Sequence, residues 1–231
     1  MKASILTSLV SLAGLTMVSA MAVDIRSDIP EGYTVVPMTW TGPIEEGGKN
    51  HTFKGTAEDV LAQIKKLNPN FVEFAESKEK DDSTKLSMRA LEARQPASPS
   101  DTRVACEGGG PNGGQGMLTR VRDARLGIEH LKWLAGFGCG APARSCARMT
   151  CNWQTAIWFC NDNDHEVSDR CDWQGYLAEL VIEKCQRHVK ADCWVPNPVC
   201  TNCCQAIDTW LVMGAQYDIR NWNVMINGGG C

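Results

Sequence analysis

The polar segment around His165 holds the side chains best suited to chemistry, namely Asp162, Asp164, His165 and Glu166. Paired carboxylates beside an imidazole can act as general acid and base, or hold a metal. Asn and Asp side chains also close turns by bonding their own backbone, so residues 161–164 are typical of a turn as well. We favour the turn and assign no catalytic residue. Asp164, His165 and Glu166 remain the candidate set for an alternative in which the protein is a hydrolase.

Metal and cofactor motifs are incomplete in this chain. Residues 162–164 lack the glycine and the distal glutamate of a calcium loop. The glycine-rich residues 108–116 precede a helical pattern, but the lysine and hydroxyl residue of a phosphate-binding loop are missing. The 23 basic and 27 acidic residues form no basic block, so no nucleic-acid partner is expected. We predict no metal and no cofactor.

The tryptophans raise the question of a carbohydrate-binding platform. Trp158, Trp173 and Trp222 lie in core-facing patterns, whereas Trp133 and Trp153 are the candidates for exposure. In a chain with little other aromatic content, most tryptophans are expected in the core.

The first twenty residues are typical of a signal peptide. Lys2 precedes an apolar run, and Val18-Ser19-Ala20 has the small residues after which signal peptidase cuts. No later stretch approaches the ~20 apolar residues of a membrane span, so no transmembrane anchor is expected. The sequence predicts a secreted, extracellular protein.

The cysteines predict a fold held by disulfide bonds. All twelve lie between Cys106 and Cys231, and an even number in an oxidising compartment favours pairing. Zinc is the competing interpretation, because four of them cluster at residues 193–204 with Cys-x-x-Cys spacing. We favour disulfides for all twelve: Cys106, Cys139, Cys146, Cys151, Cys160, Cys171, Cys185, Cys193, Cys200, Cys203, Cys204 and Cys231.

Four regions follow from the changes in composition. Residues 1–20 are the signal peptide, and residues 21–72 form a pro-region or a small accessory lobe. Residues 73–101 are charged, then rich in Pro and Ser, which is typical of a linker. Cleavage after Arg94 and an uncut linker are both open. Residues 102–231 form the cysteine-rich domain, and Asn50 begins the Asn-x-Thr site where a glycan is expected.

Hydrophobic periodicity predicts an α+β fold. In the first half we expect strands at 33–40 and 51–53, then a helix capped by Thr56 with Asp59 in the capping-box position. In the second half, strands at 102–106, 155–160 and 221–226 alternate with helices at 117–134 and 172–185, the latter capped by Asp172. Residues 207–213 fit either a helix or a strand. This order predicts a disulfide-stapled two-layer α/β sandwich with both helices on one face of a small sheet.

Several short stretches of the cysteine-rich part resemble those of a known group of proteins. They are Cys146-Ala147-Arg148 with Cys151, residues 156–163, Cys171 to Cys185, and 214–224 with Cys231. Over residues 102–231 the chain resembles the small secreted cysteine-rich proteins of filamentous fungi, many of them candidate effectors. Proteins of this shape have been compared, at the level of the fold, with α/β-sandwich killer toxins. The resemblance implies a non-enzymatic effector or toxin-like module that binds a host or competitor protein, a glycan or a membrane component. The alternative is a small extracellular hydrolase, such as a nuclease, that uses Asp164, His165 and Glu166.

Overall fold

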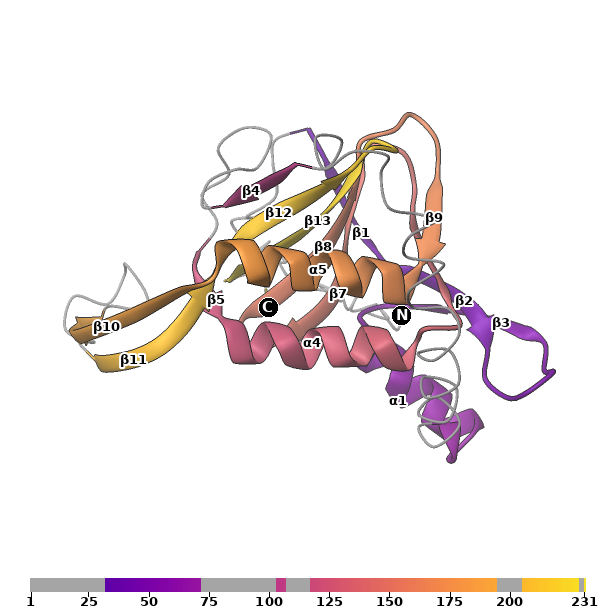
Figure 1. Cartoon of the computed structure of the whole chain (residues 1–231). Helices are drawn as coiled ribbons and strands as arrows, with labels where there is room; N and C mark the ends of the chain where they lie inside the picture. Colours follow the sequence, from indigo (N-terminus) through magenta and orange to yellow (C-terminus); the bar gives the residue numbers. More distant parts are fainter. Residues whose placement is uncertain (1–31, 72–102, 107–116, 195–204, 229–230) are drawn as a thin grey trace, which may run out of the picture.

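The computed structural model describes residues 32–71, 103–106, 117–194, 205–228 and 231, without the side chains of 192–194 and 205. Over these residues the protein is α+β, with three sheets and three α-helices (Figure 1). The predicted signal peptide, the linker with Arg94 and the glycine-rich residues 108–116 lie outside the described ranges.

The largest sheet has six strands in the order β1-β7-β8-β13-β12-β4. Their bounds are β1 (Thr34–Pro37), β7 (Ser145–Asn152), β8 (Thr155–Asn161), β13 (Trp222–Gly228), β12 (Gly214–Asp218) and β4 (Val104–Cys106). β1 pairs parallel with β7, and the other neighbours are antiparallel. Pro37 therefore lies on an edge strand, as predicted, because proline has no N–H for a ladder on both sides.

Two smaller sheets flank the first. One contains β3 (Asn50–Lys54), β2 (Thr39–Pro43), β6 (Gly138–Ala141) and β9 (Val167–Arg170), in that order. The other contains β10 (Arg187–Trp194), β11 (Gln205–Val212) and β5 (Thr119–Arg120). The β10–β11 hairpin projects away from the rest of the molecule (Figure 1). The ambiguous segment 207–213 is therefore mostly strand.

The helices are α1 (Ala57–Leu67), α4 (Val121–Trp133) and α5 (Cys171–Cys185). α4 packs on β7 and β8, and α5 packs on β12, β13 and β4, so both lie along the same face of the six-stranded sheet (Figure 1). The α+β class is confirmed, whereas the specific two-layer sandwich is not. The prediction omitted the two further sheets, whose strands pair residues far apart in the sequence.

Two predicted helix starts are wrong. Helix α4 begins at Val121 and not at residue 117, because Thr119 and Arg120 pair with β11 as a short strand. Helix α5 begins at Cys171 with Arg170 as its N-cap, and Asp172 does not cap it. The Asp172 carboxylate is instead ion-paired with the Arg170 guanidinium. In α1, by contrast, Thr56 and Asp59 form the predicted capping box.

Residues 34–71 share one hydrophobic core with the cysteine-rich part. Trp40, Val60 and Ile64 are fully buried in the same cluster as Leu131 and Phe137. β2 also pairs with β6, and β1 with β7, so backbone hydrogen bonds join the two parts. No cysteine precedes Cys106, so these contacts are non-covalent. Whether 21–72 is removed as a pro-region stays a prediction.

Four disulfides staple the described part of the chain: Cys106–Cys185, Cys139–Cys171, Cys146–Cys160 and Cys151–Cys231. The first two tie α5 to β4 and β6 at its opposite ends. The third crosses between β7 and β8, and the fourth joins β7 to the last residue of the chain. Disulfide bonding is thus confirmed for eight cysteines, while the 193–204 cluster lies outside the described side chains. Such bridge density is typical of small extracellular proteins.

Candidate functional site

The segment around His165 forms the turn that the sequence predicted. The Asn161 side chain accepts a hydrogen bond from the Asn163 N–H at 3.0 Å and donates to the carbonyl oxygen of His165 at 2.8 Å. His165 Nδ1 lies 2.9 Å from Asp164 Oδ1, and these side chains are 69% and 91% exposed. The hydrogen bond from His165 lowers the pKa of Asp164, and Glu166 is also exposed. A carboxyl with a lowered pKa is poorly suited to act as a general acid near neutral pH.

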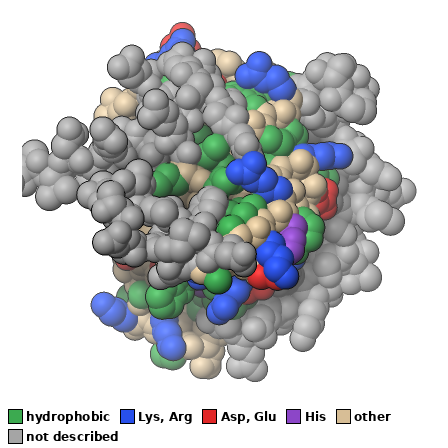
Figure 2. Space-filling view, turned by 90° about the vertical axis from the view of Figure 1, so that its left-hand side faces the viewer, with side chains coloured by type: hydrophobic (Ala, Val, Ile, Leu, Met, Phe, Trp, Pro, Cys, Tyr) green, Lys and Arg blue, Asp and Glu red, His purple; other side chains and the backbone are tan. Residues whose placement is uncertain are grey.

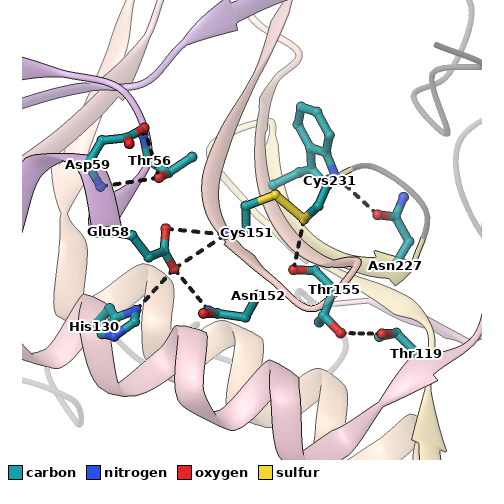
Figure 3. Close-up of a disulfide and its surroundings, with 11 residues drawn as sticks. Thr56, Glu58, Asp59, Thr119, His130, Cys151, Asn152, Thr155, Asn227 and Cys231 are labelled. Atoms are coloured by element: carbon teal, nitrogen blue, oxygen red, sulfur yellow. Dashed lines mark hydrogen bonds and ion pairs between the residues drawn. A yellow bond between two sulfur atoms is a disulfide. The ribbon is translucent and has the colours of Figure 1, made fainter.

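A second carboxylate, on Glu58 in the first turn of α1, accepts hydrogen bonds from several protein groups (Figure 3). Both of its oxygens lie 3.3 Å from the Cys151 N–H. Its Oε1 also accepts from Asn152 Nδ2 at 2.9 Å and from His130 Nδ1 at 3.0 Å. Burial by itself would raise the pKa of Glu58, but the hydrogen bond from His130, with further donors, outweighs burial and lowers it. Glu58 is therefore a carboxylate anion held by donors from α4 and β7.

His130, on α4, is one of the donors to Glu58. Because a carboxylate only accepts, the His130 Nδ1–H is the donor to Glu58, which leaves Nε2 as the ring's other polar atom. The His130 ring also lies 5.3 Å from the ring of Trp133, one turn along α4. His188 lies in β10, just after the end of α5, and bonds Asp208 at 2.8 Å.

A groove of about 400 Å³ lies between α1 and α4. Its polar lining comes from Glu58, Lys65, Asn68 and His130. Apolar side chains such as Leu61, Phe71 and Trp133 make up much of the rest. We call this the α1–α4 groove. It combines an aromatic wall with a fixed carboxylate and an imidazole, which is the composition of sites for small ligands.

The turn of the β7–β8 hairpin holds an exposed tryptophan, Trp153, one residue after Asn152, which bonds Glu58. Asn152 pairs with Thr155, so Trp153 and Gln154 alone form the turn, with φ of 48° and 72°. Two residues at positive φ make a type I′ turn, which favours Asn-Gly. Trp153 is 84% exposed. Its neighbour Asn152 bonds Glu58, and Cys151 is bridged to Cys231, so the turn rests on a rigid base (Figure 3).

The other tryptophans fall as the sequence predicted. Trp158, Trp173 and Trp222 are buried, and Trp133 is partly exposed. A further exposed tryptophan, Trp210, was not singled out; it lies 51% exposed on β11 of the projecting hairpin. On the face of the molecule at that end, Figure 2 shows Lys and Arg side chains interspersed with hydrophobic and acidic ones. Among the described side chains of that face, basic groups are therefore mixed with others and do not form a uniform patch.

The sequence also led to predictions about a glycan, a metal site and a membrane anchor. Asn50 is exposed at the start of β3, where a glycan can be accommodated, and glycosylation stays a prediction. Within the described ranges, no group of three or more His, Cys, Asp or Glu side chains is arranged to hold a metal ion. None of the described helices is long and apolar enough to cross a membrane.

Comparisons with known proteins add no relative: no protein-family model, curated protein or solved structure matches this chain. The resemblance to fungal cysteine-rich proteins therefore remains a proposal, and function has to be argued from the site.

Sequence reasoning missed Glu58 and the turn at Trp153. The one local signal for Glu58 is its place in the first turn of a capped helix, where the helix dipole favours an anion. Its partners come from α4 and β7, far along the chain, and no local pattern predicts them. The Trp153 turn lacks the Gly or Asn-Gly signal by which such turns are recognised.

Proposed function

We propose that this protein is a secreted, non-enzymatic binding module of the effector or toxin type, which acts outside the cell that produces it. The four disulfides support an extracellular setting, because such bonds persist in oxidising compartments. The resemblance of residues 102–231 to fungal cysteine-rich proteins supports the effector type.

The main support for the proposal is that Trp153 is both exposed and held in a left-handed backbone conformation. A left-handed conformation costs a non-glycine residue roughly 1–2 kcal/mol, and a side chain that is 84% exposed recovers little of this by packing. Strained and exposed residues of this kind point to function more than to stability. Tryptophan is also enriched among the residues that dominate binding interfaces. A rigid turn that presents it therefore favours recognition of a partner.

The hydrolase alternative has less support from the geometry. Asp164 and His165 are solvent-exposed on a turn, and the pKa of Asp164 is lowered. Catalytic carboxyl groups that act as acids are instead buried or paired so that their pKa rises.

The test uses the purified, oxidised protein carrying a fluorescent label. It is incubated with plant, fungal and bacterial cells, and surface-bound fluorescence is measured for the wild type, Trp153→Ala and Ile219→Ala. Ile219 is the matched control, because it is 61% exposed in the β12–β13 turn. We expect wild-type and Ile219→Ala protein to bind at least one cell type, and Trp153→Ala to lose most of that binding.

Absence of surface binding by the wild type, or equal binding by Trp153→Ala, would contradict the proposal. The hydrolase alternative is tested in parallel with nucleic acid and polysaccharide substrates. Turnover that His165→Ala abolishes would establish the alternative.

A further inference from the structure

The α1–α4 groove has the size and lining of a ligand site, and the proposed function leaves its ligand unnamed. At about 400 Å³ it falls in the range of small-molecule sites, roughly 300–1,000 Å³. Its aromatic walls come from Trp133 and Phe71, on elements distant in the sequence. Trp133 is held in place by packing against the core and against the His130 ring.

The Glu58 carboxylate lines the groove as a hydrogen-bond acceptor. Oε1 receives donors from His130, Asn152 and the Cys151 N–H, and Oε2 lies 3.3 Å from the same N–H. The Thr56 side chain also bonds the carboxylate, so a ligand hydroxyl would compete with Thr56 for the remaining lone pair of Oε2. O–H to carboxylate bonds are among the stronger hydrogen bonds.

Three other polar residues line the groove, and the amide of one of them, Asn68, donates to the Ile44 carbonyl at 2.7 Å. His130 Nδ1 donates to Glu58, so the ring lines the groove with Nε2 as its remaining polar atom. Lys65, two turns along α1 from Glu58, adds a donor at the same groove. Acceptor and donor groups therefore stand beside a flat aromatic surface.

We propose that this groove binds a carbohydrate, with a sugar ring packed on Trp133 and its hydroxyl groups bonded to Glu58, His130 and Lys65. The proposal rests on the function above and names the ligand class. A pyranose ring has an apolar C–H face and hydroxyls around its edge, which matches this arrangement. A phosphate would meet the negative charge of Glu58, and a lipid chain would offer no hydrogen bond to the polar groups of Glu58, His130 and Lys65.

Trp153 extends the site beyond the groove. Trp153 follows Asn152, whose side-chain amide donates to Glu58 at 2.9 Å. It does not line the groove itself, and we assign its 84% exposed side chain to sugar units that extend past the groove. An oligosaccharide rather than a single sugar is the ligand that uses both tryptophans.

The probes are soluble hexasaccharides of β-1,4-linked N-acetylglucosamine, β-1,4-linked glucose and β-1,3-linked glucose, with the corresponding disaccharides. Binding to the full-length oxidised protein is measured by calorimetry and by saturation-transfer NMR. We expect at least one hexasaccharide to bind. Trp133→Ala and Glu58→Gln should each weaken it by about tenfold or more, which corresponds to ~1.4 kcal/mol. Trp153→Ala should weaken the hexasaccharide more than the disaccharide.

The matched control is Trp210→Ala, which removes an exposed tryptophan from the projecting β10–β11 hairpin and should leave binding unchanged. Because Trp133 packs on the core, each variant is checked by thermal melting, and Trp133→Phe keeps an aromatic surface in the groove. Recovery of binding in Trp133→Phe supports the stacking role. Binding that survives both Trp133→Ala and Glu58→Gln overturns the site.

The two proposals fail in different ways. If no oligosaccharide binds while cell-surface binding persists and needs Trp153, the carbohydrate site is refuted and a protein partner follows. If neither occurs, the binding function is refuted as well.

Discussion

Replacing Glu58 by alanine removes the anion that connects α1 to β7 and α4. Its carboxylate accepts from the Cys151 N–H at 3.3 Å, from the Asn152 amide at 2.9 Å and from His130 at 3.0 Å. Hydrogen bonds to charged groups contribute roughly 1.5–3 kcal/mol each, and a buried N–H left without an acceptor costs about 1–3 kcal/mol. The Glu58 side chain is 26% exposed, so water replaces part of this loss. We expect Glu58→Ala to lower the free energy of unfolding by about 2–4 kcal/mol.

Urea denaturation of the oxidised protein, followed by tryptophan fluorescence, measures this loss. Glu46→Ala is the control, because Glu46 is exposed in the loop before β3, and it should change stability by less than about 0.5 kcal/mol. Glu58→Gln keeps an acceptor oxygen but removes the charge. Its loss of unfolding free energy should therefore lie between those of Glu58→Ala and Glu46→Ala.

The charge of Glu58 also predicts a dependence on pH. Its pKa is lowered in the folded protein, below the value of about 4.3 expected in the unfolded chain. The contribution to stability is therefore complete above about pH 5 and is lost as the pH falls through the folded pKa. Glu58→Gln lacks this contribution, so between pH 5 and 3 it should lose less stability than the wild type.

Equal stability of the wild type, Glu58→Ala and Glu58→Gln, with the same slope against pH, would refute this reasoning. Residues 34–71 would then be held by strand pairing and apolar packing, and the contacts of Glu58 would contribute nothing measurable.

Three further outcomes are expected. Gly127→Ala should destabilise by about 1–3 kcal/mol in thermal melting, because the added Cβ would lie 2.5 Å from a threonine hydroxyl of β7. Gly136→Ala, which meets nothing within 4 Å, should melt close to the wild type. Trp153→Asn should leave stability unchanged or raise it by up to about 1 kcal/mol in urea titrations, because asparagine adopts the left-handed region readily; a large loss would make Trp153 structural. Replacing Cys151 and Cys231 by serine should cost about 4 kcal/mol, since this bridge spans a separation of 80 residues.

Local patterns in the sequence predicted several elements correctly. The capping box and the apolar spacing of α1 lie within one helix, so residues 56–68 alone specify its ends. β8 and β13 are rich in large apolar residues, a composition that predicts buried strands, and every residue of both is buried. The division of tryptophans into core and surface followed from the same short-range spacing. Cysteine number and position indicated a stapled fold, because pairing depends on the compartment more than on local conformation.

Tertiary structure decided the features that pair distant residues. Thr119 and Arg120 have helical spacing with the residues after them, yet pairing with β11 makes them a strand. Only the approach of α1 to α4 brings Glu58 to His130, across 72 residues. The turn at Trp153 carries no glycine signal, so its left-handed backbone follows from the register of β7 against β8. Short-range patterns report which residues are buried, whereas the partner that buries them is set by the free energy of the whole chain.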